Sequence, residues 1–343
     1  MNIDFLDRKS NVSLNLEDLY SRFGYWKYTM NRFESYAFYM ENENFLNDNR
    51  VITLQGSSGK LLALKPDVTM SIVKNYKMLG KSKIYYNEPV FKVPQGESEF
   101  KEIHQAGIEY IGNVDVYQTA EVLNLAIKSL QTIGEDYRLC ISHVGIVNEV
   151  LESLKFSVSE KYQVITYLQQ KNSHDLTKYL MELGRVEDIK IFEILSKVDG
   201  DLNEGINFLI EQNMFKGLEF LREVATILSE ITDCSKISLD FSHLSTTEYY
   251  NDLVFTGYVK GLANSVLSGG RYDNLLSKMG VRDKSALGFA VNLSEVSKLP
   301  AKKVSKRKIV RYNDTKKPLD MLKEANIWFE EGESFCILQG GSQ

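Results

Sequence analysis

The sequence predicts an α+β fold in which an antiparallel sheet is flanked by helices. Short apolar runs with strand-like alternation follow one another between residues 50 and 142 and again from 237 to 291. Between them, residues 145–232 show helical periodicity only. Strands in consecutive runs and helices in blocks are typical of an α+β antiparallel sheet. The chain has 343 residues, 43% of them hydrophobic and 25% charged, which is ordinary for a globular protein with a sizeable core.

In the first half of the chain, helices and paired strands are expected to alternate. A helix is expected within 15–40, where Asn15 and Asp18 could cap the first turn. Two apolar runs around a turn-rich link at 55–60 predict a hairpin over 50–64. That link lacks the spacing of a phosphate-binding loop. The elements expected next are a helix at 67–80, strands near 84–93 and 100–111, a helix at 114–133 and a strand at 137–142.

The second half opens with the helical block 145–232, which we predict to be an inserted subdomain. Its apolar stripes, at 176–183 and 218–228, have the spacing of helix faces that pack in a core. Strands are expected to return at 237–241, 253–255 and 266–267, and a helix at 273–279 precedes a strand at 287–291. Beyond Pro300, a basic linker leads to a short strand–helix–strand over 308–338.

Charge and residue counts exclude several classes of function. The net charge of −5 provides no global positive field for nucleic acid, and the basic run at 302–311 is more typical of a solvated linker. The three cysteines form no CxxC pair, and the four histidines show no ligand spacing, so neither a metal site nor a disulfide framework is predicted. No apolar run approaches the roughly 20 residues of a membrane span. We therefore expect a cytoplasmic protein without metal or cofactor.

Carboxylates and polar side chains suited to a small zwitterion lie on segments expected to be ordered. Gln105 and Glu109 are four residues apart, so on a strand they share one face. Together with Asp67, Glu109 could bind an ammonium group and an imidazole N–H through charge-assisted hydrogen bonds. The other candidates are a hydroxyl, two aromatic rings with polar tips and two glycines that allow close backbone approach: Thr69, Tyr249, Tyr250, Gly269 and Gly270.

Each candidate taken alone has a simpler structural interpretation. An aspartate after a proline is usually a helix N-cap, and a lone glutamate is usually at the surface. Paired tyrosines usually pack on a sheet, and paired glycines usually form a turn. The N-cap interpretation applies to Asp67 and the surface position to Glu109. Sheet packing applies to Tyr249–Tyr250, and the turn applies to Gly269–Gly270.

The order and spacing of four segments carry a family resemblance. These segments are Leu64–Thr69 (LKPDVT), His104–Gly112 (HQAGIEYIG), Glu248–Tyr250 (EYY) and Leu267–Leu276 (LSGGRYDNLL), and Gly288-Phe289-Ala290 follows. In this order they resemble the class II histidyl-tRNA synthetase catalytic domain, in which LRPE/DxT, FHQxGxE and DYY segments line the histidine pocket. The resemblance spans residues 1 to about 297 and implies a six- or seven-stranded antiparallel sheet flanked by helices, a dimer, and an inserted helical region that corresponds to 145–232.

The resemblance also assigns a role to each candidate side chain. It implies histidine binding by Asp67, Thr69, Gln105, Glu109, Tyr249 and Tyr250. It adds support for that pocket from Lys92, Gly269, Gly270 and Arg271. It leaves open which carboxylate binds which nitrogen of histidine.

The sequence departs from the synthetase pattern where ATP should bind. Lys92 stands at an arginine position, and Glu97 and Glu99 would repel a triphosphate. The GFAxGLER ending reads GFAVNLSEV without its arginine, and the arginine expected shortly before the tyrosine pair is replaced by Ser245-Thr246-Thr247. Adenylyl transfer depends on positioning and charge neutralisation. The resemblance therefore implies a histidine binder with no catalytic residue and no aminoacylation.

The C-terminal region supports the same conclusion. Residues 298–343 are too short for an anticodon-binding domain, which needs roughly 90 residues. This tail and the stretch Pro89–Lys92 resemble the regulatory subunit of the short-form ATP phosphoribosyltransferase. That family implies a homodimer that joins a catalytic subunit in a hetero-octamer, activates it and mediates allosteric feedback inhibition by histidine. The partner condenses ATP with phosphoribosyl pyrophosphate in the first step of histidine biosynthesis, and no tRNA binding is expected.

Three alternatives remain open at this level. The chain could be a true histidyl-tRNA synthetase, although the missing arginines oppose that function. It could be another synthetase-like paralogue that modifies or binds a different partner. Its pocket could also be a structural relic on a scaffold protein.

Overall fold

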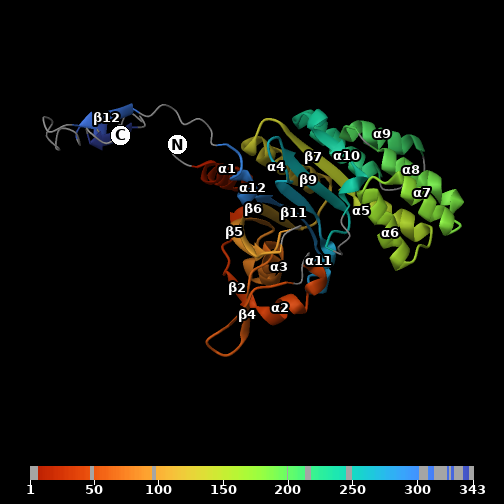
Figure 1. Ribbon diagram of the computed structural model, residues 1–343, viewed down its shortest axis with the longest axis horizontal. Helices are drawn as coiled ribbons and strands as arrows, with labels where there is room; N and C mark the ends of the chain where they lie inside the picture. The colour runs from red at the N-terminus through yellow and green to blue at the C-terminus, as the bar shows by residue number, and fades with distance from the viewer. Residues whose placement is uncertain are drawn as a thin grey trace.

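The structure is a computed structural model and describes residues 7–46, 50–94, 98–198, 200–212, 218–244, 249–300, 308–312, 323, 326–327 and 335–339. Its centre is an eight-stranded sheet with the order β1-β5-β6-β11-β10-β9-β7-β8 (Figure 1). The six inner strands are antiparallel: β5 (Lys83–Lys92), β6 (Lys101–Gly112), β11 (Ser285–Asn292), β10 (Leu267–Arg271), β9 (Leu253–Val259) and β7 (Tyr137–His143). The α+β fold class is confirmed.

Two short edge strands make the sheet larger than the expected six or seven strands. β1 (Trp26–Lys27) pairs in parallel with β5, and β8 (Ile237–Leu239) pairs in parallel with β7. β1 is two residues long, too short to show strand periodicity in the sequence, whereas β8 lies within the strand expected at 237–241. The antiparallel part of the sheet is therefore the predicted one, with a parallel strand added at each edge.

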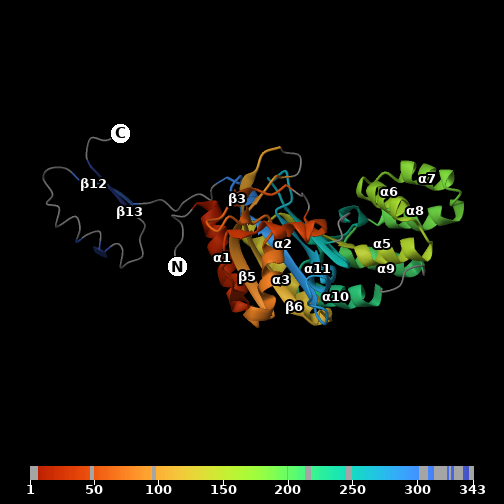
Figure 2. The ribbon, with the colours of Figure 1, turned by 90° about the horizontal axis from the view of Figure 1, so that it is seen from below.

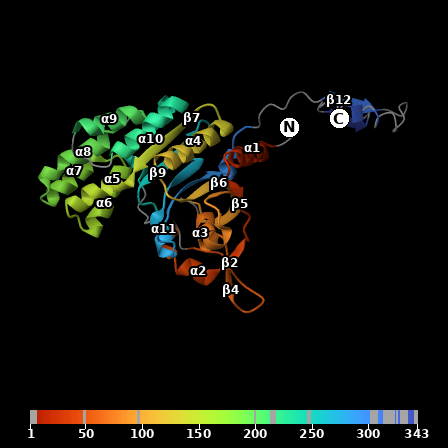
Figure 3. The same ribbon diagram turned by 180° about the vertical axis from the view of Figure 1, so that it is seen from behind.

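One face of the sheet is covered by α1 (Arg8–Arg22), α4 (Val116–Ile133), α10 (Leu218–Ile231) and the short α12 (Leu293–Val296). Figure 3 shows α4 and α10 against the strands. Their apolar stripes form one large core with the inward residues of the sheet, such as Ile141 and Phe289. The stripe predicted at 218–228 is buried, which confirms it as a core face.

The other face holds a second core around β5, β6 and β11. It contains α2 (Tyr36–Met40), η1 (Glu43–Phe45), α3 (Val68–Leu79), α11 (Asp273–Lys278) and a small sheet of order β2-β4-β3. The strands of that sheet are β2 (Phe33–Ser35), β3 (Thr53–Gln55) and β4 (Leu61–Leu64), so the predicted hairpin is confirmed. The N-cap of α3 is Asp67, whose side chain accepts a hydrogen bond from the Met70 amide.

The predicted helical block lies beside the β7–β8 edge of the sheet. It contains α5 (Val144–Ser153), α6 (Val158–Gln169), α7 (Ser173–Glu182), η2 (Val186–Asp188), α8 (Ile189–Lys197) and α9 (Leu202–Gln212). Figure 2 shows α6, α7 and α8 far from the small sheet and α2. After α9 the chain returns to the main sheet as α10, and η3 (Cys234–Lys236) leads into β8. We call α5–α9 the helical subdomain.

One local prediction was wrong, and one structural alternative is excluded. The first helix begins at Arg8 instead of near residue 15, because Asp7 caps it by accepting from the Ser10 amide. Asn15 lies inside that helix and bonds to Asn11. Gly269-Gly270 is not a turn, because β10 continues through both glycines to Arg271.

The C-terminal region is described only in part. β12 (Lys308–Tyr312) and β13 (Phe335–Gln339) pair in parallel, which agrees with the predicted strand–helix–strand pattern. The basic residues at 302–307 lie outside the described residues. Over the described chain, no helix combines the length and apolarity that crossing a membrane requires.

Candidate ligand-binding pocket

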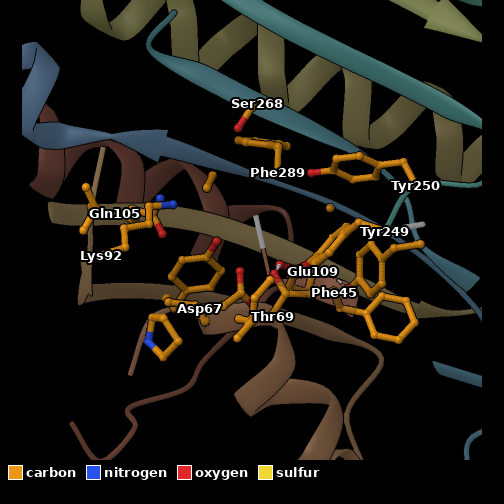
Figure 4. Close-up of a pocket in the computed structure, with 18 residues that line it drawn as sticks. Phe45, Asp67, Thr69, Lys92, Gln105, Glu109, Tyr249, Tyr250, Ser268 and Phe289 are labelled. Atoms are coloured by element: carbon orange, nitrogen blue, oxygen red, sulfur yellow. Dashed lines mark hydrogen bonds between the residues drawn. The ribbon is translucent and has the colours of Figure 1, made fainter. Parts of the chain in front are cut away.

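A cavity of about 130 Å³ opens over the central strands, on the face that carries α3 (Figure 4). It is bounded by the N-terminus of α3, strands β5, β6, β10 and β11, and the segment before β9. Seven residues singled out from the sequence line it: Asp67, Thr69, Lys92, Gln105, Glu109, Tyr249 and Tyr250. Positions separated by as many as 183 residues thus meet in one site, as their shared family resemblance implies.

Glu109 forms the buried floor of the pocket, with only 2% of its surface exposed. Its two oxygens accept hydrogen bonds from Thr69 Oγ1 at 2.6 Å and from the Tyr272 hydroxyl at 2.5 Å. Burial raises the pKa of Glu109 to about 8, although those two hydrogen bonds oppose the rise. With this pKa the Glu109 carboxyl group is mostly protonated at pH 7, and its burial excludes the surface position that a lone glutamate usually takes.

Gly288 is required by the position of Glu109. A Cβ atom at residue 288 would lie 1.9 Å from Glu109 Oε2 and 2.5 Å from the Ile108 carbonyl oxygen. Gly288 faces Glu109 in the β6–β11 register, so even a methyl group would push the carboxyl group out of place. The glycine of the GFA motif thus makes room for the floor of the pocket.

Asp67 has both of the roles that the sequence left open. It caps α3 by accepting from the Met70 amide at 2.8 Å, and it also lines the cavity. Burial raises the pKa of Asp67, while the Met70 hydrogen bond and the nearby Lys92 charge work against that rise. The N-cap and the ligand-binding interpretations are therefore compatible, because one carboxylate has two oxygens.

Aromatic rings form one wall of the pocket. The Tyr249 and Tyr250 rings meet edge to face with centroids 4.9 Å apart, and Phe45 lies 6.4 Å from Tyr249. Burial raises the pKa of both tyrosines well above the usual value. Their hydroxyls stay neutral at physiological pH, so this wall offers apolar surface and uncharged polar tips.

Tyr272 is the most important pocket residue that sequence analysis missed. Its ring lies 6.0 Å from that of Tyr249, and its hydroxyl is bonded to Glu109. It follows Arg271 directly in the GGRYD segment, so the motif contains both a supporting residue and a residue that contacts the pocket floor. The remaining lining residues, which are mostly apolar, stand outside the candidate set: Phe45, Leu46, Pro66, Val68, Tyr86, Val93, Ser268, Gly288, Phe289 and Ala290.

Arg271 and the two glycines support the pocket without lining it. Arg271 pairs with Asp252 at 3.2 Å and with Asp273 at 2.8 Å, next to the pocket segment. A Cβ at Gly270 would lie 2.7 Å from Tyr250 Cδ1, and one at Gly269 would lie 2.4 Å from a backbone oxygen of β11. The expectation that these glycines admit a ligand is corrected, because the space they leave is filled by protein.

The charges of the pocket suit a small zwitterion. Lys92 is the one cationic side chain among the described lining residues, and it lies with two carboxyl groups and the Gln105 amide. Behind the cavity, Lys65 and Glu88 form a buried ion pair of 3.2 Å. The described residues contain no group of histidine, cysteine and acidic side chains that could hold a metal.

The region expected to bind ATP in a synthetase is partly outside the described residues. Gln95–Glu97 and Ser245–Glu248 fall there. Counting along GFAxGLER from Gly288, the arginine position is occupied by Glu295, which pairs with Lys298 at 2.5 Å. Asn292 caps α12 by accepting from the Ser294 and Glu295 amides. This end of β11 therefore presents a carboxylate where a synthetase presents a guanidinium group.

An antiparallel sheet with helices on both faces and a polar pocket over its centre defines a class II synthetase-like protein. The family model described as "Histidyl-tRNA synthetase" matches residues 4–296. The ATP phosphoribosyltransferase regulatory subunit of Caldanaerobacter subterraneus subsp. tengcongensis is 30% identical, over 96% of this chain and 90% of its own. The histidine–tRNA ligase of Methanocaldococcus jannaschii is 32% identical, over 85% of this chain and 71% of its own.

A solved structure shows the same fold over nearly the whole chain. It is the regulatory subunit/histidyl-tRNA synthetase from Bacillus halodurans, with a TM-score of 0.79, 21% identity and coverage of 98% of this chain and 89% of its own. The chain therefore belongs to the histidyl-tRNA synthetase family, in the group of ATP phosphoribosyltransferase regulatory subunits.

Proposed function

We propose that this chain is the non-catalytic regulatory subunit of an ATP phosphoribosyltransferase and that its pocket binds free histidine. The observation that carries the proposal is the set of polar and charged groups that line the cavity. Asp67, Glu109 and Gln105 face one cation, Lys92, beside an aromatic wall. Histidine matches this set with an ammonium group, an imidazole and a carboxylate. The name of the Caldanaerobacter relative supports the regulatory role.

The surroundings of the two carboxylates favour one orientation of histidine. Asp67 and Lys92 influence each other electrostatically, and the ammonium and carboxylate of an amino acid leave the same carbon. Asp67 would then bind the ammonium group, and Lys92 would bind the carboxylate. Glu109 lies deeper and would bind the imidazole, whose ordinary pKa is about 6.5. A protonated Glu109 could pass its proton to this ring and form an ion pair without net proton exchange.

Regulation needs a catalytic partner and two states of the complex. A ligand shifts the equilibrium between the two states only through the difference in its affinity for them. We propose that the chain activates a short catalytic subunit within a hetero-octamer and that histidine stabilises an inhibited state. The chain would contribute no ATP chemistry, since a carboxylate stands at the arginine position near the end of β11.

The second candidate function is histidine–tRNA ligation. The 32% identity to the Methanocaldococcus ligase favours it. The substitutions at Lys92 and Glu295 oppose it, because lysine lacks the bidentate geometry of arginine and glutamate repels phosphate. ATP–pyrophosphate exchange that depends on histidine would establish this second function and reject the first.

The deciding experiment measures phosphoribosyl-ATP formation by the cognate short catalytic subunit, with and without this chain, across a histidine titration. We expect activity that requires the chain and falls as histidine rises. Asp67→Asn should keep activation but weaken inhibition, because asparagine also caps α3 yet loses the charge. Asp136→Asn, at an exposed carboxylate far from the pocket, is the matched control. Activity indifferent to the chain would reject the regulatory role.

A further inference from the structure

The segment that carries Tyr249 and Tyr250 into the pocket is tied to the helical subdomain on its N-terminal side. Asp240 pairs with Lys171 Nζ at 2.9 Å, and the Leu244 carbonyl accepts from Gln169 Nε2 at 2.8 Å. Gln169 ends α6, and Lys171 lies in the turn that leads to α7. Residues 240–244 are therefore fixed to the α6–α7 turn.

The same segment is tied to the subdomain again on its C-terminal side. Asp252 Oδ1 lies 2.7 Å from His143 Nε2, and the Asp252 carbonyl accepts from the Val144 amide at 2.8 Å. His143 is also the N-cap of α5, because its Nδ1 accepts from the Ile146 amide at 3.2 Å. Asp252 thus joins the start of the helical subdomain to the residues that follow Tyr250.

This second tie continues to the floor of the pocket. Asp252 Oδ2 pairs with Arg271, and the Arg271 carbonyl accepts from the Asn251 amide at 3.1 Å. The next residue is Tyr272, which donates to Glu109. Tyr250 and Tyr272 therefore lie directly beside one set of polar contacts, made by Asn251, Asp252 and Arg271, that also reaches α5.

Lys171 provides an independent sign that the N-terminal tie matters. Its φ angle is +51°, a left-handed conformation that is unfavourable for an L-residue with a Cβ atom and that glycine adopts freely. A glycine would relieve this strain but would lose the contact with Asp240. Among the described residues, Lys155, at φ +56° after α5, is the one other non-glycine residue with positive φ.

We propose that the helical subdomain transmits the state of the pocket, through the Lys171–Asp240 and His143–Asp252 ties, to α6 and α7. A bound ligand fixes Tyr249 and Tyr250, and the two ties pass this ordering to the helices that hold their other ends. The inference rests on histidine binding in the pocket. It deepens the proposed regulation by naming the element that carries the signal away from the site.

The test compares hydrogen exchange of the full chain with and without saturating histidine, after calorimetry has established binding. In the wild type we expect amides of α6 and α7 to exchange about tenfold more slowly with histidine. The variant K171G/Q169A should bind histidine but lose this slowing. K155G/Q170A is the matched control, since it makes the same two types of change in the subdomain but leaves the Lys171–Asp240 and Gln169–Leu244 contacts in place, and it should behave as the wild type.

Two results would overturn the inference. One is histidine binding without slower exchange in α6 and α7 of the wild type, and the other is undiminished slowing in K171G/Q169A. If that variant does not fold, Asp240→Asn breaks the same ion pair from the other side, and asparagine still caps η4 (Phe241–His243). Absence of any histidine binding by calorimetry is a different result, which would reject the proposed function together with the inference.

Discussion

Glu109→Gln should change the pH dependence of folding stability in a defined direction. The folded protein holds a proton on Glu109 up to about pH 8, whereas the unfolded chain releases it near the ordinary value of 4.5. Between these values the folded state binds more protons, so its stability falls as pH rises. The glutamine variant has no such group. Wild type and variant should therefore diverge between pH 4.5 and 8.

The magnitude follows from the width of this window. Each pH unit within it costs the wild type about 1.4 kcal/mol relative to the variant. From pH 6 to pH 8 the difference in free energy of unfolding should thus shift by roughly 2–3 kcal/mol in favour of the variant, and it should level off above pH 8. Glutamine can replace the local contacts, because its oxygen accepts from one hydroxyl, Thr69 or Tyr272, and its amide donates to the other.

Urea unfolding of both proteins from pH 5.5 to 9 provides the measurement. Taking the difference between the two curves at each pH cancels every other titrating group that the proteins share. Parallel curves across the whole range would show that Glu109 is ionised in the folded protein, and this would refute the assignment of a protonated floor to the pocket. Divergence in the opposite direction would refute it equally.

Four further predictions concern the pocket and its support. Above pH 8, histidine binding to the wild type should weaken by up to about tenfold per pH unit relative to Glu109→Gln, because the proton for the imidazole must then come from solvent. Calorimetry measures both affinities, and an equal dependence of the two on pH would contradict this prediction. Lys92→Met should lower histidine affinity about 10- to 100-fold but leave histamine, which lacks the carboxylate, within twofold; equal losses would exclude a carboxylate contact. Gly288→Ala should abolish histidine binding and destabilise the fold by about 1–3 kcal/mol in urea, whereas wild-type affinity would show that Glu109 is not displaced. Lys65→Met should cost about 3–5 kcal/mol by stranding the Glu88 charge, while K65M/E88L should recover most of that loss; no recovery would show that the ion pair itself is needed.

Most of the candidate site could be found from the sequence, because its residues stand in motifs of fixed order. Asp67, Gln105 and Glu109 were selected by chemistry and by strand spacing, and the structure places all three around one cavity. Tyr272 was overlooked, because nothing in the local sequence distinguishes a core tyrosine from one that donates to a buried carboxyl group. The expectation that Gly269 and Gly270 let a ligand come close was wrong, since a glycine indicates a close contact but does not identify the atoms that make it.

The sequence by itself determined the fold class, the helical block and the family, because periodicity and motif order are local properties of the chain. It also identified the hairpin at 50–64 and the stripe that α10 buries in the core. Only the tertiary structure decided the protonation of Glu109, since its pKa depends on burial by residues far away in the chain. The ties to the pocket segment likewise join distant parts of the chain. Lys171 and its partner Asp240 are separated by 69 positions, and His143 and its partner Asp252 by 109, and no local pattern encodes such pairing.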